Sequence, residues 1–187
     1  VEVGRPYGDI YARGLERDAQ GRVIVGANGI PLVTGGQSVR VGNFNPDWTG
    51  GITNRFSYKD FSMSFLIDIS QGGEVASFTE ANLAGFGSST ATLAGREGFV
   101  YDGVTESGAA NTVQITSEQF WSTLGGRNTP VGELFTKDAS NIRFRELVLG
   151  YSLPSRIIET LPFSNISLSV VGRNLFYIQN KAGTIDP

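Results

Sequence analysis

The sequence predicts an all-β, antiparallel fold, and three observations support this prediction. The chain of 187 residues contains 25 glycines, only 18% charged residues, and little of the Ala/Leu/Glu/Lys bias of helical proteins. Four segments alternate apolar and polar residues with a period of two, as strands with one apolar face do. Each of these segments has ten residues or more, whereas an average strand has about five or six.

The first forty residues predict short strands and turns. Residues 1–13 are rich in Gly and Tyr and predict a short strand. Residues 14–40 contain many turn signals, so we expect a loop with one or two hairpin strands at 22–25 and 38–41.

Residues 48–58 and 61–70 predict a β-hairpin. The apolar residues fall on even positions in the first strand and on odd positions in the second. A two-residue turn, or a four-residue turn of the same parity, brings both apolar sets to one face of the sheet. For the two-residue turn, the predicted pairs are Tyr58 with Phe61, Phe56 with Met63 and Ile52 with Ile67.

The long segment 72–141 is predicted to be mostly irregular, with one short helix. Thr116 is the candidate N-cap of this helix, Gln119 occupies the capping-box position and Gly125 ends it. A loop of this length is typical of an excursion from a larger scaffold.

Alternation returns at 142–153 and at 164–176. Between these strands we expect a short helical turn, with Pro154 at its first helical position. Residues 177–187 are predicted to lack regular structure.

Strand length and the chemistry of the second face favour a membrane over a soluble sandwich. A transmembrane strand needs about 9–11 residues, and the non-apolar face carries Ser, Thr and Gly rather than the Lys and Glu of a water-exposed face. Aromatic residues lie near the strand ends, and short and long connections alternate along the chain. Both features are typical of a barrel in a bilayer. We therefore predict a segment of a transmembrane antiparallel β-barrel with long extracellular loops; four strands are too few to close a barrel.

The alternation assigns residues to each face of this barrel segment. The predicted lipid-facing residues are Ile52, Phe56, Met63, Phe65, Ile67, Leu147, Leu149, Tyr151, Leu168 and Val170. The predicted lumen-facing residues are Arg55, Asp68, Glu146 and Arg173. Arg143 and Arg145 have the parity of the apolar face, so we expect them to reach the headgroup region about 25 Å from the turn end.

Composition argues against several functions. The chain has no histidine or cysteine and a net charge of −3, which disfavours a metal centre, a histidine base and nucleic-acid binding. Asp68 and Glu146 could form a catalytic carboxylate pair, but lumen-lining charge is the far more common role, and we predict no enzymatic activity and no cofactor. Phe120 and Trp121 are candidates for contact with a ligand or a lid, although such pairs more often pack a loop helix.

Four segments resemble one protein family. "VGNFNPDWTGGITNRFSYKDFSMSFLIDISQGGEV" (41–75), "RFRELVLGYSLP" (143–154), "ISLSVVGRNLF" (166–176) and "REGFVYDGVTESGAANTVQITSEQFW" (96–121) are similar to blocks of SusC/RagA-family TonB-dependent outer-membrane transporters. The resemblance implies that residues 1–187 are the C-terminal part of a 22-stranded barrel in the bacterial outer membrane, with the plug and the final strand outside this chain. It also implies import of glycans or peptides, coupling to the TonB complex and a SusD-like surface lipoprotein as partner.

One departure from the family pattern, besides the final strand outside this chain, concerns a calcium-loop-like stretch. Members often carry an Asp-rich, calcium-loop-like stretch, whereas the corresponding region here has Asp18 as its one carboxylate, so we predict no metal there. The alternative to the importer is a soluble all-β carbohydrate-binding module, which would partition into buffer without detergent.

Overall fold

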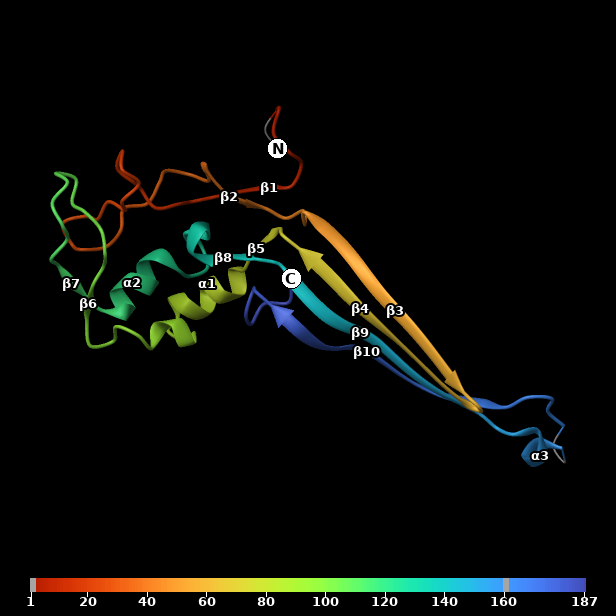
Figure 1. The fold of residues 1–187 in the computed structure, drawn as a ribbon. Helices are drawn as coiled ribbons and strands as arrows, with labels where there is room; N and C mark the ends of the chain where they lie inside the picture. Colours follow the sequence, from red (N-terminus) through yellow and green to blue (C-terminus); the bar gives the residue numbers. More distant parts are fainter. Residues whose placement is uncertain (1–2, 160–161) are drawn as a thin grey trace. The chain divides into compact units, whose positions relative to one another are not determined.

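The computed structural model describes residues 3–159 and 162–187 of the chain. They form two compact units, each assembled from two separate stretches of sequence (Figure 1). The sheet unit contains residues 45–73 and the described residues of 138–187, and the loop unit contains residues 3–44 and 74–137. The structure is mainly β, and none of the helices in its described residues is long and apolar enough to cross a membrane.

The sheet unit is an antiparallel sheet of four long strands (Figure 1). Their spatial order is β10-β9-β4-β3. All four predicted strands are confirmed: β3 (Trp48–Tyr58), β4 (Phe61–Gln71), β9 (Asn141–Ser152) and β10 (Ser167–Asn180). The prediction that regular structure ends at residue 176 is wrong, because β10 continues to pair with β9 as far as Asn180.

The turn between β3 and β4 consists of Lys59 and Asp60 alone. Lys59 has a φ of 53°, the left-handed conformation that tight hairpin turns use. The two-residue turn is therefore confirmed, and the four-residue alternative is wrong. All three predicted pairs are present: Tyr58 with Phe61, Phe56 with Met63 and Ile52 with Ile67.

A β-bulge in β9 changes which face its first residues occupy. The pairing with β4 shifts between Leu66 and Ile67, and Arg145 is the extra residue. Because side chains alternate with a period of two, one inserted residue reverses the faces on its far side. Phe144 thus shares the apolar face, and Arg143 lies opposite Asp68 on the other face. The expectation that Arg143 lies on the apolar face is wrong.

The register places four phenylalanine rings in a row across the apolar face. Phe56, Phe65, Phe144 and Phe176 come from four different strands, and successive ring centroids are 6.2, 5.9 and 5.3 Å apart. Such cross-strand aromatic pairs contribute roughly 0.2–1 kcal/mol each. A second bulge, with Asn174 at a φ of 50°, brings Phe176 opposite Phe144.

The connection after β9 contains α3 (Ser155–Ile158), which confirms the predicted short helical turn. Pro154 is the N-cap of this helix rather than its first residue. Residues 160–161, near the end of the predicted turn, lie outside the described residues.

The loop unit is built from short elements around its own hydrophobic core. Its strands form three two-stranded sheets, β1 with β2, β5 with β8 and β6 with β7. The core cluster consists of Leu15, Val23, Ile115, Phe120, Leu124 and Val131. The elements are β1 (Asp9–Ala12), β2 (Val39–Asn43), β5 (Glu74–Ala76), α1 (Phe78–Gly85), η1 (Thr90–Thr92), β6 (Phe99–Val100), β7 (Gln114–Ile115), α2 (Ser117–Leu124), η2 (Gly132–Phe135) and β8 (Thr136–Asp138).

These elements correct two predictions about the loop unit. Segment 72–141 contains two α-helices, α1 and α2, rather than the one predicted, and it packs with the N-terminal residues around a common core. Within the predicted strand at 22–25, residues 23–25 form isolated bridges rather than a hairpin strand. The predicted strand at 38–41 is present within β2.

The predicted helix is confirmed as α2, with its capping box. The backbone N–H of Gln119 donates to Thr116 Oγ1 at 3.3 Å, and the backbone N–H of Thr116 donates to Gln119 Oε1 at 2.8 Å. Gly125 follows as the C-cap. The reciprocal bonds satisfy N–H groups that a helix N-terminus otherwise leaves unpaired.

Candidate functional site

The apolar face of the sheet unit is the first candidate site. The strand register puts all ten residues predicted to face lipid on this one face. Many of them are largely exposed, including Leu168 at 64% and Val170 at 72%. A contiguous exposed apolar surface on a folded protein marks contact with another protein or with a membrane.

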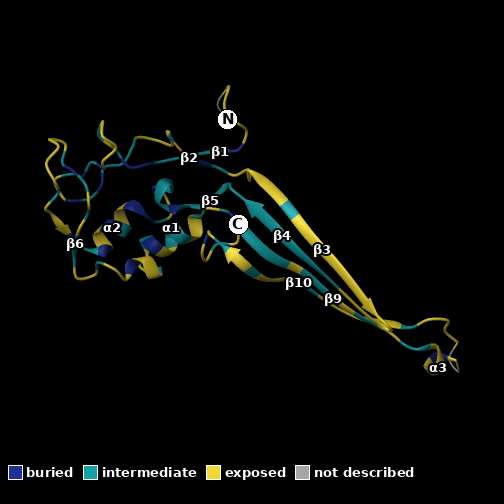
Figure 2. Cartoon of the chain, viewed as in Figure 1, coloured by how far each residue is buried: buried dark blue, intermediate teal, exposed yellow. Residues whose placement is uncertain are grey.

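The two outer strands of this sheet are open. Figure 2 shows β3 exposed along nearly its whole length, whereas β4 is mostly half-buried between its neighbours. Among the described residues, β3 and β10 each pair along one edge only. Long unpaired edges leave rows of backbone N–H and C=O groups that require further strands or water.

The opposite face of the sheet carries the charged residues. The Arg173 guanidinium donates to the Glu146 carboxylate at 2.9 Å. Arg143, paired across the strands with Asp68, lies over the Tyr177 ring at 4.2 Å and also binds the Asp186 carboxylate. Arg55 is opposite Ser64 on the same face. The four residues predicted to face the lumen thus share a face, and the bulge adds Arg143 to it.

The two carboxylates that the sequence offers as a catalytic pair both lie opposite arginines. Glu146 is held in an ion pair with Arg173, and Asp68 lies across from Arg143 in the neighbouring strand. The chain supplies no histidine or cysteine to act as base or nucleophile.

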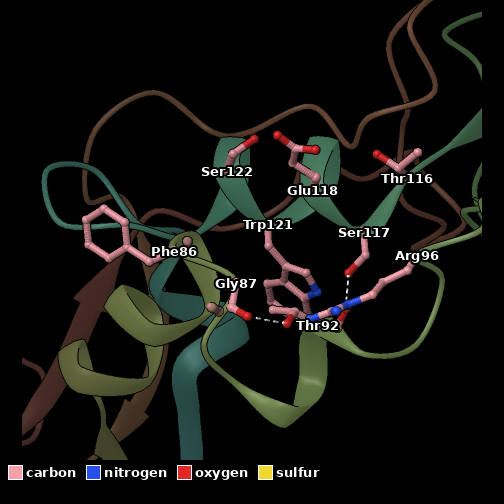
Figure 3. A pocket seen from close by; sticks show the side chains of 11 residues that line it. Phe86, Gly87, Thr92, Arg96, Thr116, Ser117, Glu118, Trp121 and Ser122 are labelled. Carbon is pink, nitrogen blue, oxygen red and sulfur yellow. Dashed lines mark hydrogen bonds between the residues drawn. The ribbon is translucent and has the colours of Figure 1, made fainter.

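The second candidate site is a pocket beside α2 in the loop unit, with a volume of about 500 Å³. Figure 3 shows the Trp121 indole extending from α2 toward Thr92 and Arg96, with Phe86 at the other end. Trp121 is half-buried, and its ring centroid lies 4.9 Å from that of Phe120 and 6.0 Å from that of Phe135.

The two aromatic residues singled out in the sequence have different surroundings. Phe120 is only 6% exposed and packs between the rings of Phe99, Tyr101 and Trp121. It therefore belongs to the core of the loop unit. Trp121 lines the pocket and is accessible there.

A hydrogen-bond network holds the wall of this pocket. The backbone carbonyl of Thr92 accepts from Ser117 Oγ at 2.9 Å and from Arg96 Nε at 3.2 Å. The Thr92 hydroxyl donates to the carbonyls of Ser89 and Gly87. Sequence reasoning missed Arg96, because a lone arginine in a glycine-rich loop carries no local signal that it neighbours a helix some twenty residues later.

The described residues contain no cluster of three or more His, Cys, Asp or Glu side chains suited to a metal ion. The Asp18 carboxylate accepts from the backbone N–H groups of Gln20 and Arg22 and from the Arg22 guanidinium. Desolvation opposes these bonds, but together they hold the pKa of Asp18 below its usual value. The carboxylate thus serves to fix a turn.

Comparison with known proteins adds one relative. No family model matches the chain. The chain is 25% identical over 155 residues to TonB-dependent receptor P3 of Formosa agariphila, and the match covers 79% of the chain. The chain spans 13% of the length of that receptor, which is named as a receptor and not as an enzyme.

Proposed function

We propose that this chain is the C-terminal wall and outer-loop portion of a TonB-dependent importer of the SusC/RagA type in the bacterial outer membrane. In this proposal residues 1–187 contribute four strands to a 22-stranded barrel. The loop unit contains the long extracellular connection at 72–141. The similarity to a much longer TonB-dependent receptor supports this assignment.

The observation that carries the proposal is the exposed apolar face of the sheet unit. Eleven residues of β4 span about 33 Å at 3.3 Å per residue, which a tilt near 40° reduces to about 25 Å of height. That height equals the apolar band of an outer-membrane barrel. The ten apolar side chains, the phenylalanine row and the aromatic residues at the Lys59-Asp60 turn would then contact lipid.

The charged face would line the barrel interior. Arg55, Asp68, Glu146 and Arg173 would meet water there, and the bulge at Arg145 removes Arg143 from the lipid side. Arg143 lies at the end of β9 far from the turn, where a cation facing lipid costs about 0–1 kcal/mol, so the reversal of faces removes a small penalty and is compatible with the membrane assignment. The open edges of β3 and β10 would pair with strands from the rest of the same polypeptide, since unpaired edges are not tolerated in lipid.

Such an importer would take up glycans or peptides, driven by the TonB complex through an N-terminal part of the protein. A SusD-like lipoprotein would close over its outer side. Trp121, in a pocket of the loop unit, is the residue that we propose for ligand or lid contact.

Cysteine labelling of the full-length receptor tests the proposal, because this chain has no cysteine of its own. Single cysteines at Phe144, Leu147 and Leu149 carry an environment-sensitive fluorophore, and Arg143, Glu146 and Gly150 provide matched positions on the opposite face. In vesicles containing lipids brominated on the acyl chains, we expect quenching at the first three positions only. Equal quenching on both faces, or none at the apolar positions, refutes the lipid-facing assignment; full extraction into buffer favours the soluble carbohydrate-binding module.

A further inference from the structure

A groove of about 660 Å³ crosses the apolar face of the sheet unit beside the Lys59-Asp60 turn. Its floor is the backbone of Ser62, Gly150 and Ser169, which pair across the strands and whose side chains belong to the opposite face. The walls are two rows of larger side chains, Tyr58, Phe61, Tyr151 and Leu168 nearer the turn and Phe56, Met63, Leu149 and Val170 farther from it.

The groove has the length of one acyl chain. It is lined by all four long strands, and three strand spacings of about 4.8 Å give a length of roughly 14 Å. The hydrocarbon core of a bilayer is about 30 Å thick, so one leaflet provides about 15 Å. An acyl chain in this groove contacts side chains on both sides, whereas a chain on a flat surface contacts them on one side only.

The groove also lies at the depth where the polar head of a lipid meets its chains. Its two walls are within two residues of the turn, which is about 7 Å along the strand and about 5 Å in height at a tilt near 40°. Tyr58 is 73% exposed on the wall beside the turn. Tyrosine is enriched at this level of a bilayer, because its ring is apolar and its hydroxyl is polar.

Two opposite charges lie at the end of the groove. Lys59 and Asp60 follow Tyr58 directly in the sequence, and both are exposed. The Lys59 ammonium lies 5.3 Å from the centroid of the Tyr58 ring. Within the described residues neither charge forms an ion pair, so both remain available to a ligand. A headgroup that carries a phosphate and an amine complements this pair.

We propose that this groove binds one phospholipid with an amine-bearing headgroup, of the phosphatidylethanolamine class. One acyl chain lies between the two rows of side chains, the phosphate accepts from the Lys59 ammonium, and the amine donates to the Asp60 carboxylate. This inference rests on the proposed importer function and goes beyond it, because a lipid-facing surface requires no preference for a headgroup. Short turns of outer-membrane barrels lie on the periplasmic side, so the lipid belongs to the inner leaflet.

The surroundings disfavour two other occupants. A stable protein interface buries about 800 Å² on each partner, whereas a groove of about 14 by 7 Å covers only about 100 Å². A lipid that carries negative charge alone would meet the Asp60 carboxylate as well as the Lys59 ammonium, and the turn as a whole has no net charge.

Photo-crosslinking of the full-length receptor in detergent tests the inference. The probe is phosphatidylethanolamine with a diazirine on one acyl chain, and mass spectrometry of the digested protein locates the label. We expect saturable labelling concentrated at residues 56–63 and 149–151. Unlabelled phosphatidylethanolamine should compete at least about threefold better than phosphatidylglycerol, which has the phosphate but no amine. Diacylglycerol, which has neither group, should compete least.

Variants separate the contributions of the headgroup and the groove. Lys59→Gln should weaken the binding of both phospholipids about fivefold, and Asp60→Asn should remove the preference for the amine. Leu149→Trp fills the groove and should lower the labelling at 56–63. Leu147→Trp is its matched control, because Leu147 lies on the same strand and face but does not line the groove. Unchanged unfolding midpoints exclude a folding defect in these variants.

Three results would overturn the inference. One is labelling that spreads evenly along the apolar face without competition, which indicates ordinary contact with surrounding lipid only. The second is unchanged labelling and competition in both Lys59→Gln and Leu149→Trp. The third is crosslinking of the groove to a second protein chain that excludes the probe. Quenching by brominated lipids is an independent measurement: normal quenching with even labelling removes only the phospholipid site, whereas loss of quenching removes the lipid-facing assignment itself.

Discussion

Substituting Phe65 with arginine places a charge near the middle of the proposed lipid-facing surface. Phe65 is four residues from Phe61 at the turn end of β4, about 13 Å along the strand and about 10 Å in height. In a band about 25 Å high this depth is near the midplane, where an arginine costs roughly 2–4 kcal/mol, against 0–1 kcal/mol near the interface.

Phe61→Arg is the matched control for this change. Both residues lie on the same strand and face, and both make ring contacts with β9, Phe61 with Tyr151 at 4.6 Å and Phe65 with Phe144 at 5.9 Å. The difference between the two variants therefore reports depth in the bilayer. We expect Phe65→Arg to be less stable by about 2 kcal/mol or more, a shift of about thirtyfold or more in the ratio of folded to unfolded protein.

The assay is guanidinium unfolding of the full-length receptor from phosphatidylcholine vesicles, followed by tryptophan fluorescence. Phe65→Gln, which changes shape without adding charge, should fall between the native protein and Phe65→Arg. Equal destabilisation by Phe61→Arg and Phe65→Arg would refute the reasoning, because a surface in contact with water or protein has no such depth dependence.

Two further predictions concern local structure. Thr116→Ala removes the N-cap side chain and one half of the capping box of α2, so we expect the helix to lose about 1 kcal/mol of local stability. Hydrogen exchange of the α2 amides measures this loss, with Thr112→Ala at an exposed position as the control. Unchanged protection of these amides in Thr116→Ala would contradict the role of the cap. Hydrogen bonds from Ser140, and then Lys181, outweigh desolvation and hold the pKa of Asp138 below 3.8. Its stabilisation is therefore complete above pH 3.8 and is lost as the pH falls through the lower folded value. Asp18 contributes a loss of the same sign, so unfolding midpoints between about pH 5 and 2 should fall less in Asp138→Asn than in the native protein, and an equal fall in both would contradict the role of Asp138.

Local patterns in the sequence were sufficient to predict several elements. The alternation in 48–58 and 61–70 and the parity of a two-residue turn determine the hairpin register, because side chains alternate strictly and the turn length sets which residues face each other. Thr116 and Gln119 similarly identify the start of α2, because both partners of the capping box lie within one helical turn.

Other features depended on contacts between residues far apart in the sequence. The bulge at Arg145 exists only in the pairing of β9 with its neighbouring strands, and no local pattern marks it, so the faces of Arg143 and Phe144 were decided by the tertiary structure. The loop unit likewise required Leu15 and Val23 to join a core with Phe120 and Val131, about a hundred residues later. The sequence by itself determined the strands and their apolar stripe, because alternation is local; the tertiary structure alone decided the bulge, the loop core and the pocket, because their energies come from non-local packing and pairing.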